Sequence, residues 1–97
     1  MSNKIISVNF EVYGRVQGVF FRKYTKKRCE ELGLKGWCMN TEIGTVVGHI
    51  EGEKSKIEEM KHWLQYKGSP QSLIDKVVFR DEQELSQPTF SDFKIRR

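Results

Sequence analysis

The chain has 97 residues, 37% of them hydrophobic and 31% charged, so we expect one globular domain over residues 1–97 with a single modest core. Its formal net charge of +4 at pH 7 favours anionic ligands but does not establish nucleic-acid binding. No apolar run reaches membrane-spanning length, and the N-terminal residues lack the apolar core of a secretory signal. We therefore expect a cytoplasmic protein that does not insert into membranes.

The first half of the chain is predicted to form a strand, a loop and a helix. Apolar and polar side chains alternate over residues 6–13, which predicts a strand with one buried face. A loop with two glycines follows. From about residue 21 to residue 32, apolar positions recur at spacings of four, four and three, which indicates one face of a helix. Gly33 suits the left-handed turn that often ends a helix.

A predicted hairpin comes next. Residues 34–40 and 45–51 are expected to form two strands, joined at 41–44, where Gly44 can take a positive φ. Gly52 is expected to close the second of these strands. Ser55 and Glu58 then have the spacing of a capping box at the start of another helix.

The last part of the chain contains this second helix and two further strands. The apolar stripe of the helix consists of Ile57, Met60, Trp63 and Leu64. Gly68-Ser69-Pro70 is expected to end the helix. We expect a fourth strand over residues 74–79, loop for most of residues 80–92, and a short fifth strand over residues 93–95.

This element order predicts an α+β fold of two layers. The strand-helix-strand-strand-helix-strand order, with a short C-terminal strand, matches the ferredoxin-like arrangement of an antiparallel sheet covered on one face by two helices. A right-handed crossover through the first helix would place the loop after the first strand beside the connection after the second.

Residues 14–22 (GRVQGVFFR) have the character of an anion cradle. Gly14 and Gly18 leave room for backbone N–H groups to approach a ligand, and the following helix start adds free N–H donors and partial positive charge. Arg22 adds a planar fork that matches phosphate oxygens. Taken alone, such a pattern more often forms a simple turn than a phosphate site.

Residues 14–22 also resemble the first signature of the acylphosphatase family, and residues 36–46 (GWCMNTEIGTV), followed by Gly52, resemble the second. The resemblance extends over nearly the whole chain and implies hydrolysis of small-molecule acyl phosphates. It implies that Arg22 clamps the phosphoryl group and that Asn40 orients the attacking water, with Gly14 and Thr41 in support. The loop residues that would surround the phosphoryl group are Arg15, Val16, Gln17, Gly18, Val19 and Phe20.

The resemblance also sets expectations about cofactors and partners. We expect no cofactor and no metal, because Cys29 and Cys38 form no Cys-x-x-Cys pair and no histidine cluster joins them. Inorganic phosphate is expected as product and competitive inhibitor. With no oligomerisation signal in the sequence, we expect a monomer. His49 and His62 lack a catalytic partner at motif spacing and are expected to be surface residues.

Two other functional classes deserve comparison. RNA-binding domains share this element order, but they stack bases on aromatic residues of the third strand, and residues 45–51 contain none. We therefore expect no nucleic-acid partner. A non-catalytic phosphate-binding or protein-interaction module stays open, because a cradle binds anions whether or not a water is positioned beside it.

Overall fold

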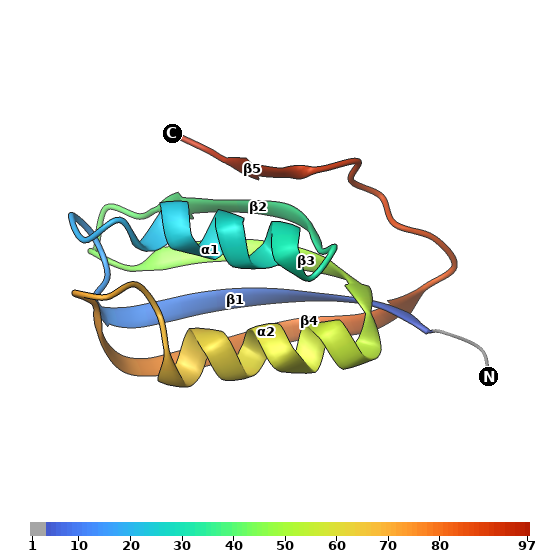
Figure 1. The fold of residues 1–97 in the computed structure, drawn as a ribbon, viewed down its shortest axis with the longest axis horizontal. Coiled ribbons are helices and arrows are strands. Elements are labelled where there is room, and N and C mark those ends of the chain that lie inside the picture. The colour runs from blue at the N-terminus through green and yellow to red at the C-terminus, as the bar shows by residue number, and fades with distance from the viewer. Residues whose placement is uncertain (1–3) are drawn as a thin grey trace.

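The computed structural model describes residues 4–97, which form a five-stranded sheet with two helices packed on one of its faces (Figure 1). The elements in chain order are β1 (Ile5–Arg15), α1 (Phe21–Glu31), β2 (Lys35–Asn40), β3 (Val46–Glu53), α2 (Lys54–Tyr66), β4 (Leu73–Leu85) and β5 (Phe93–Ile95). This order confirms the predicted ferredoxin-like α+β fold. No helix within residues 4–97 is both long enough and apolar enough to span a membrane.

The strands are arranged in the order β4-β1-β3-β2-β5. β1 pairs antiparallel with both β3 and β4, and β2 pairs antiparallel with β3. β5, however, pairs parallel with β2, so the sheet is mixed at this edge rather than antiparallel throughout. β5 can run parallel because the connection from β4 crosses one end of the sheet, from the β4 edge to the β2 edge, before the chain turns back beside β2 (Figure 1).

The core lies between the sheet and the helices, and it includes the side chains at the apolar positions of the predicted strands and helices. Its buried apolar side chains are Ile6, Val8, Phe10, Val12, Val16, Val19, Phe21, Cys29, Leu32, Leu34, Cys38, Val46, Ile50, Ile57, Met60, Leu64 and Phe93. Gly48 faces Phe10 across the β1–β3 pair, and a Cβ at Gly48 would lie 2.3 Å from the Phe10 ring. The glycine therefore makes room for the aromatic ring in the core.

Two predictions around α2 are wrong. β3 continues through Gly52 to Glu53, and α2 begins at Lys54 with no side-chain hydrogen bond at its start. The capping box of Ser55 and Glu58 is therefore not formed, because strand runs into helix without an intervening loop. Gly52 allows close packing instead, since a Cβ there would lie 2.3 Å from Leu34 Cδ2.

The fourth strand is longer than its sequence pattern indicates. β4 extends to Leu85, which pairs with Ile5, so residues 80–85 are strand rather than loop. They are nearly all polar because β4 is an edge strand whose side chains there are mostly exposed to solvent. Apolar periodicity cannot identify such a segment.

The end of α1 follows the prediction. Gly33 has φ +72°, its N–H donates to Glu30 O, and the N–H of Leu34 donates to Cys29 O. These two bonds form the Schellman motif that ends many helices. The fold also brings the β1–α1 loop and the β2–β3 hairpin to the same end of the molecule (Figure 1).

Candidate functional site

The loop between β1 and α1 presents a run of free backbone donors. None of the amide N–H groups of residues 16–23 donates a hydrogen bond to another group in the described chain. The first turn of α1 contains no acidic side chain that would neutralise its positive end. Gly18 has φ +76°, a conformation that glycine adopts without strain. These features suit an anion cradle, and the cradle stays a prediction.

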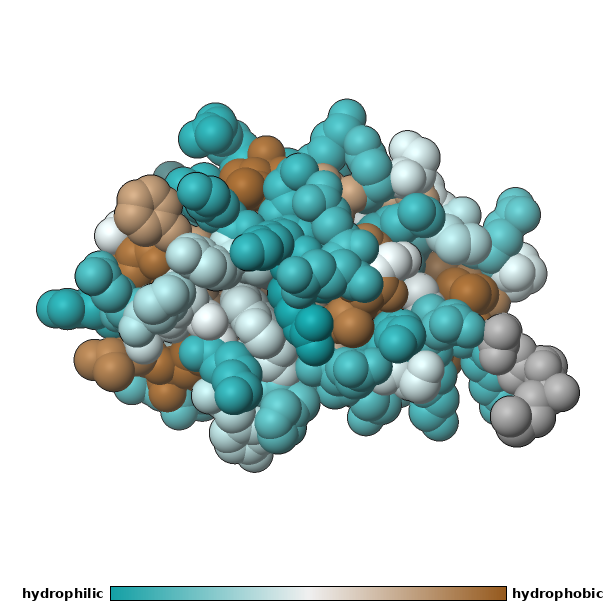
Figure 2. Space-filling view, viewed as in Figure 1, coloured by the Kyte–Doolittle hydropathy of each residue, from teal (hydrophilic) through white to brown (hydrophobic). Residues whose placement is uncertain are grey.

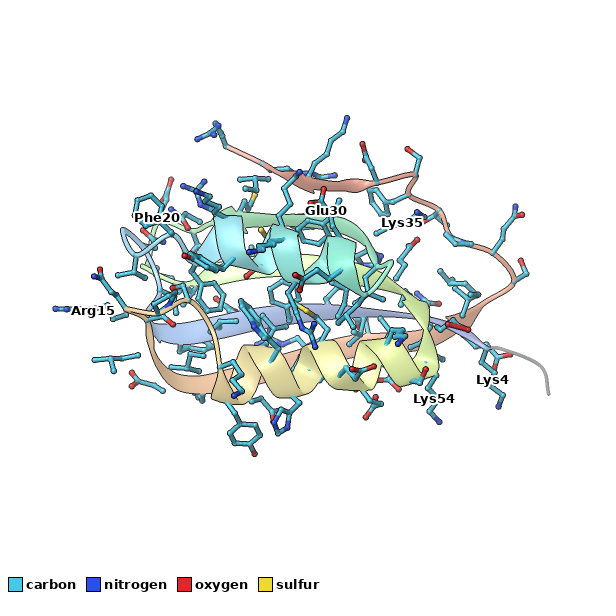
Figure 3. The ribbon with its side chains drawn as sticks, viewed as in Figure 1. Lys4, Arg15, Phe20, Glu30, Lys35 and Lys54 are labelled. Atoms are coloured by element: carbon cyan, nitrogen blue, oxygen red, sulfur yellow. The ribbon has the colours of Figure 1, made fainter. Side chains whose placement is uncertain are left out.

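The side chains of the loop divide into two groups. Val16 and Val19 are buried and anchor the loop in the core, whereas Arg15 and Phe20 are exposed at one end of the molecule (Figure 3). An anion bound at this loop would therefore meet its backbone and the exposed Arg15 and Phe20, but not the side chains of Val16 and Val19. Gly14 lies just before it, where β4 approaches so closely that a Cβ would lie 2.1 Å from Leu73 O. Gly14 thus supports the loop through packing.

Arg22 and Asn40 come from neighbouring elements at this end of the fold. Arg22 is half-buried in the first turn of α1, and its carbonyl oxygen lies 3.9 Å from Cys38 Sγ on β2. Asn40 is the last residue of β2. Its Oδ1 is buried and has no hydrogen-bond partner within residues 4–97. A buried amide oxygen without a partner is costly, so this atom is suited to accept from a ligand or water.

Gln17 joins the two segments that the family signatures mark. Its Nε2 donates to Thr41 O at 2.8 Å and to Thr45 O at 2.9 Å. The Gln17 side chain therefore spans from the cradle to the hairpin that follows Asn40, and it is not free to bind phosphate. Only the backbone N–H of Gln17 is available to the cradle. This refines the prediction that placed Gln17 among the phosphate-binding residues.

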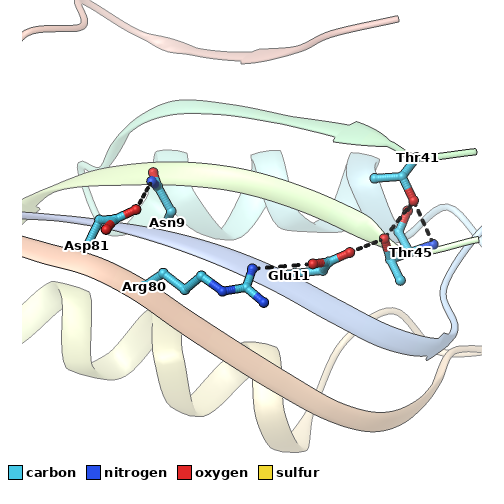
Figure 4. Close-up of polar contacts among 6 residues, drawn as sticks. All are labelled: Asn9, Glu11, Thr41, Thr45, Arg80 and Asp81. Atoms are coloured by element: carbon cyan, nitrogen blue, oxygen red, sulfur yellow. Dashed lines mark hydrogen bonds and ion pairs between the residues drawn. The ribbon is translucent and has the colours of Figure 1, made fainter. Parts of the chain in front are cut away.

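A chain of polar contacts continues from the hairpin across the sheet (Figure 4). The hydroxyls of Thr41 and Thr45 lie 2.6 Å apart, and Thr45 N donates to Thr41 Oγ1 at 3.1 Å. Thr45 Oγ1 donates to Glu11 Oε2 at 2.7 Å, and Arg80 Nη1 lies 3.4 Å from Glu11 Oε1. The bond from Thr45 is the main reason that the pKa of Glu11 lies below its usual value. Thr41 is thus part of a network that fixes the hairpin.

Sequence patterns did not indicate Glu11, Thr45 or Arg80. Glu11 lies on the polar face of an alternating strand, where a solvated carboxylate is the ordinary interpretation. Its partner Thr45 is 34 residues away in the sequence. The sole signal was a hydroxyl-rich hairpin after Asn40, which by itself predicts a turn.

The two cysteines are free and buried. Burial raises the pKa of Cys38 to about 12 and that of Cys29 well above its usual value, so both remain thiols at neutral pH. They are packed as small apolar residues, as expected. Among the described residues, no group of three or more His, Cys, Asp or Glu side chains is arranged to hold a metal ion.

A second polar cluster lies on the same face of the sheet as Glu11, away from the helices, and corrects the expectation for His49. Its side chain is only 18% exposed, with Nδ1 2.7 Å from Asn9 Oδ1 and Nε2 2.8 Å from Glu51 Oε2. Burial alone would raise the pKa of Glu51, but hydrogen bonds from Thr89, His49 and Phe90 N outweigh it and lower the pKa. This cluster fastens the segment before β5 to the sheet, which is a structural role.

Comparison with known proteins relates this chain to a protein family. The sequence model of the family described as Acylphosphatase matches residues 8–95. Acylphosphatase-1 of Homo sapiens is 48% identical over 93 residues, which cover 96% of this chain and 94% of the relative. An acylphosphatase structure from Coxiella burnetii has a TM-score of 0.83 at 35% identity, covering 96% and 94% of the two chains. One from Bacillus subtilis has a TM-score of 0.87 at 27% identity, covering 95% and 99%.

Proposed function

The chain belongs to the acylphosphatase family and hydrolyses acyl phosphates to a carboxylate and inorganic phosphate, and we propose that a positioned water attacks phosphorus directly. In this mechanism the cradle and Arg22 hold the phosphoryl group, and Asn40 holds the water. No covalent enzyme intermediate forms. Phosphoryl transfer of this kind asks the protein mainly for positioning and for stabilisation of charge.

The cradle supplies that stabilisation. The N–H groups of residues 16–23 have no other acceptor in the described chain, and they precede or begin a helix whose positive end is unneutralised. Donors fixed in this way face the non-bridging oxygens, where negative charge gathers. Each well-placed donor contributes about 2.7–4 kcal/mol in comparable oxyanion sites. The guanidinium of Arg22 adds two parallel donors and a full positive charge.

The role of Asn40 rests on one observation above all. Its Oδ1 is buried at the end of β2 and accepts no hydrogen bond from residues 4–97. A side-chain amide both donates and accepts, so it can hold a water in one orientation without being a strong base. Gln17 supports this role by connecting the cradle to the hairpin that begins at Thr41, directly after Asn40.

An acyl phosphate needs neither a general acid nor a metal for this hydrolysis. The leaving group is a carboxylate, which is stable as an anion, so no general acid has to protonate it. The cradle and Arg22 supply the positive charge that the transition state needs, so we propose that hydrolysis requires no added metal. Inorganic phosphate, the product, fits the same cradle, and we propose that it inhibits competitively.

Four further expectations enter this proposal. We propose a single domain over residues 1–97 that acts as a monomer in the cytoplasm. The two buried free cysteines suit a reducing compartment. The aromatic-free residues 45–51 argue against a nucleic-acid partner.

The decisive experiment measures both turnover and the bond that breaks. Purified protein in excess EDTA should hydrolyse acetyl phosphate and leave a simple phosphate monoester nearly intact. In ¹⁸O-labelled water, the label should enter inorganic phosphate and not the carboxylate, because water attacks phosphorus. Label in the carboxylate would contradict the mechanism. Phosphate binding without turnover would instead support a non-catalytic anion-binding module, which the family relationship does not favour.

A further inference from the structure

Exposed apolar side chains gather around the cradle. Among the described residues, four large apolar side chains are exposed: Phe20 (68%), Ile43 (77%), Tyr66 (69%) and Leu73 (65%). Phe20 is in the cradle loop, Ile43 in the β2–β3 hairpin, and Leu73 is the first residue of β4. We call Phe20, Ile43 and Leu73 the apolar rim. Apolar surface is visible at the end of the molecule where Phe20 is labelled (Figures 2 and 3).

Specific contacts hold each rim residue beside the cradle. Leu73 pairs with Arg15 in the β1–β4 ladder, immediately before the loop. The hydrogen bonds from Gln17 to Thr41 O and Thr45 O fix both ends of the hairpin segment that carries Ile43. Phe20 directly precedes α1 and belongs to the loop itself. The three side chains therefore come from three segments that lie at the same end of the molecule (Figure 1).

The conformation of Phe20 is unusual for an aromatic residue. It has φ +60° and ψ +25°, in the left-handed region that bulky side chains rarely adopt. The ring is not needed by the core, since it is mostly exposed, with Lys23 Nζ 5.8 Å from its centroid. Backbone strain of this kind is concentrated at binding and active sites. An exposed, strained aromatic in a phosphate-binding loop is thus well placed to contact the substrate.

We propose that the apolar rim receives the acyl group of the substrate and selects acyl phosphates whose acyl group is aromatic or branched aliphatic. This inference rests on the proposed function, because a phosphoryl group held in the cradle must project its acyl group toward the surroundings of the loop. The rim is small and interrupted by polar residues such as Arg15 and Glu42. A stable protein partner would need an interface of roughly 1,200–2,000 Å², whereas a single acyl group needs only a few side chains.

The test compares benzoyl phosphate with acetyl phosphate, which share the reacting group and differ in the acyl group. The measured quantity is the ratio of the two kcat/KM values, because changes in phosphoryl binding common to both substrates cancel. In the variant that combines Phe20→Asn, Ile43→Ser and Leu73→Ser, we expect the ratio to fall about fivefold to tenfold, since an open rim removes only part of the ring from water. Asparagine tolerates the left-handed backbone of Phe20 and keeps the loop in place.

Two controls make the result specific. Tyr66→Ser removes an equally exposed side chain from the end of α2 and should leave the ratio unchanged. The double variant of Ile43 and Leu73 leaves the sequence of the cradle loop unchanged, and its ratio should also fall. An unchanged ratio in the triple variant, or an equal fall in Tyr66→Ser, would overturn the proposal. Failure of the unmodified protein to hydrolyse acetyl phosphate would contradict the proposed function itself, which is a separate result.

Discussion

Replacement of Gln17 by methionine tests how the two halves of the site are held together. Methionine has a similar volume and an unbranched shape, but it cannot donate the hydrogen bonds of 2.8 and 2.9 Å to Thr41 O and Thr45 O. The backbone N–H of residue 17 stays in the cradle. The substitution therefore removes the link to the hairpin while it leaves the phosphate-binding donors in place.

The expected loss follows from the number and setting of these bonds. Each partly buried hydrogen bond contributes about 0.5–1.5 kcal/mol net to stability. The lower half of that range applies, because Thr45 O still accepts from Thr41 N, and Thr41 O still accepts from Gly44 N. We expect the free energy of unfolding to fall by about 1–2 kcal/mol. If that coupling also positions Asn40 in the transition state, kcat falls by about 5- to 30-fold.

Three measurements separate this role from direct phosphate binding. They are urea unfolding, kcat with saturating acetyl phosphate, and inorganic phosphate affinity by calorimetry. We expect the first two to fall and phosphate affinity to change less than twofold, because the N–H groups and Arg22 are intact. Gln71→Met, at an exposed position, is the matched control. A loss of phosphate affinity as large as the loss of kcat would show that Gln17 binds phosphate and that the coupling argument is wrong.

Three further outcomes follow from the structure. Inorganic phosphate should raise KM for acetyl phosphate without lowering kcat, and a purely non-competitive pattern would place the anion site elsewhere. Gly18→Val should weaken phosphate binding more than it lowers stability. A Cβ at residue 18 would meet no atom within 4 Å, so the substitution disturbs no packing, but φ +76° is strained for valine and the loop backbone has to adjust. Unchanged kinetics would mean that the loop only connects β1 to α1. The folded-state pKa of Glu51 lies below its usual 4.5, so its stabilisation is complete above that pH and is lost as pH falls through the folded-state value. Urea midpoints should therefore drop on acidification, and less so in Glu51→Gln.

The parts of the fold that sequence predicted are those in which local spacing mirrors burial. Alternation in β1 and the spacing of four, four and three in α1 each mark a single buried face. Residues 80–85 were not predicted as strand because an edge strand exposed to water needs no apolar alternation. The capping box failed because Ser55 and Glu58 have the right spacing but lie inside α2, whose start is set by the end of β3.

The candidate site also has parts that the local sequence indicates and parts that it does not. The glycines and Arg22 lie within residues 14–22, so local chemistry favours an anion cradle there, although such a pattern alone more often forms a simple turn. Asn40 by itself resembles an ordinary turn residue, and only the family signature indicated a role for it. The links from Gln17 to the hairpin and from Thr45 to Glu11 join residues 24, 28 and 34 positions apart, and a single sequence carries no pattern for such pairs. These hydrogen bonds can be recognised only in the folded structure, in which β1 lies next to β3.

Arg22 and Asn40 should differ in what they contribute, and Arg22 is the simpler case. It follows the cradle and sits at the positive end of α1, so its charge should act on phosphate both in the ground state and in the transition state. Arg22→Gln should weaken inorganic phosphate binding and lower kcat together. Arg22→Lys should restore little of either, because an ammonium cannot reproduce two parallel donors.

Asn40→Ala, in contrast, should lower kcat while phosphate affinity changes little. Asn40 belongs to β2, its Oδ1 has no partner among residues 4–97, and it is proposed to contact water more than phosphate. Phosphate affinity by calorimetry should stay within about twofold of the unmodified protein while kcat falls at least tenfold, the pattern of an interaction made mainly in the transition state. The circular dichroism spectrum should remain native, because the side chain is outside the apolar core. If Asn40→Ala lost phosphate binding as severely as Arg22→Gln with the fold intact, Asn40 would be a phosphate ligand, and the unpartnered Oδ1 would need another explanation.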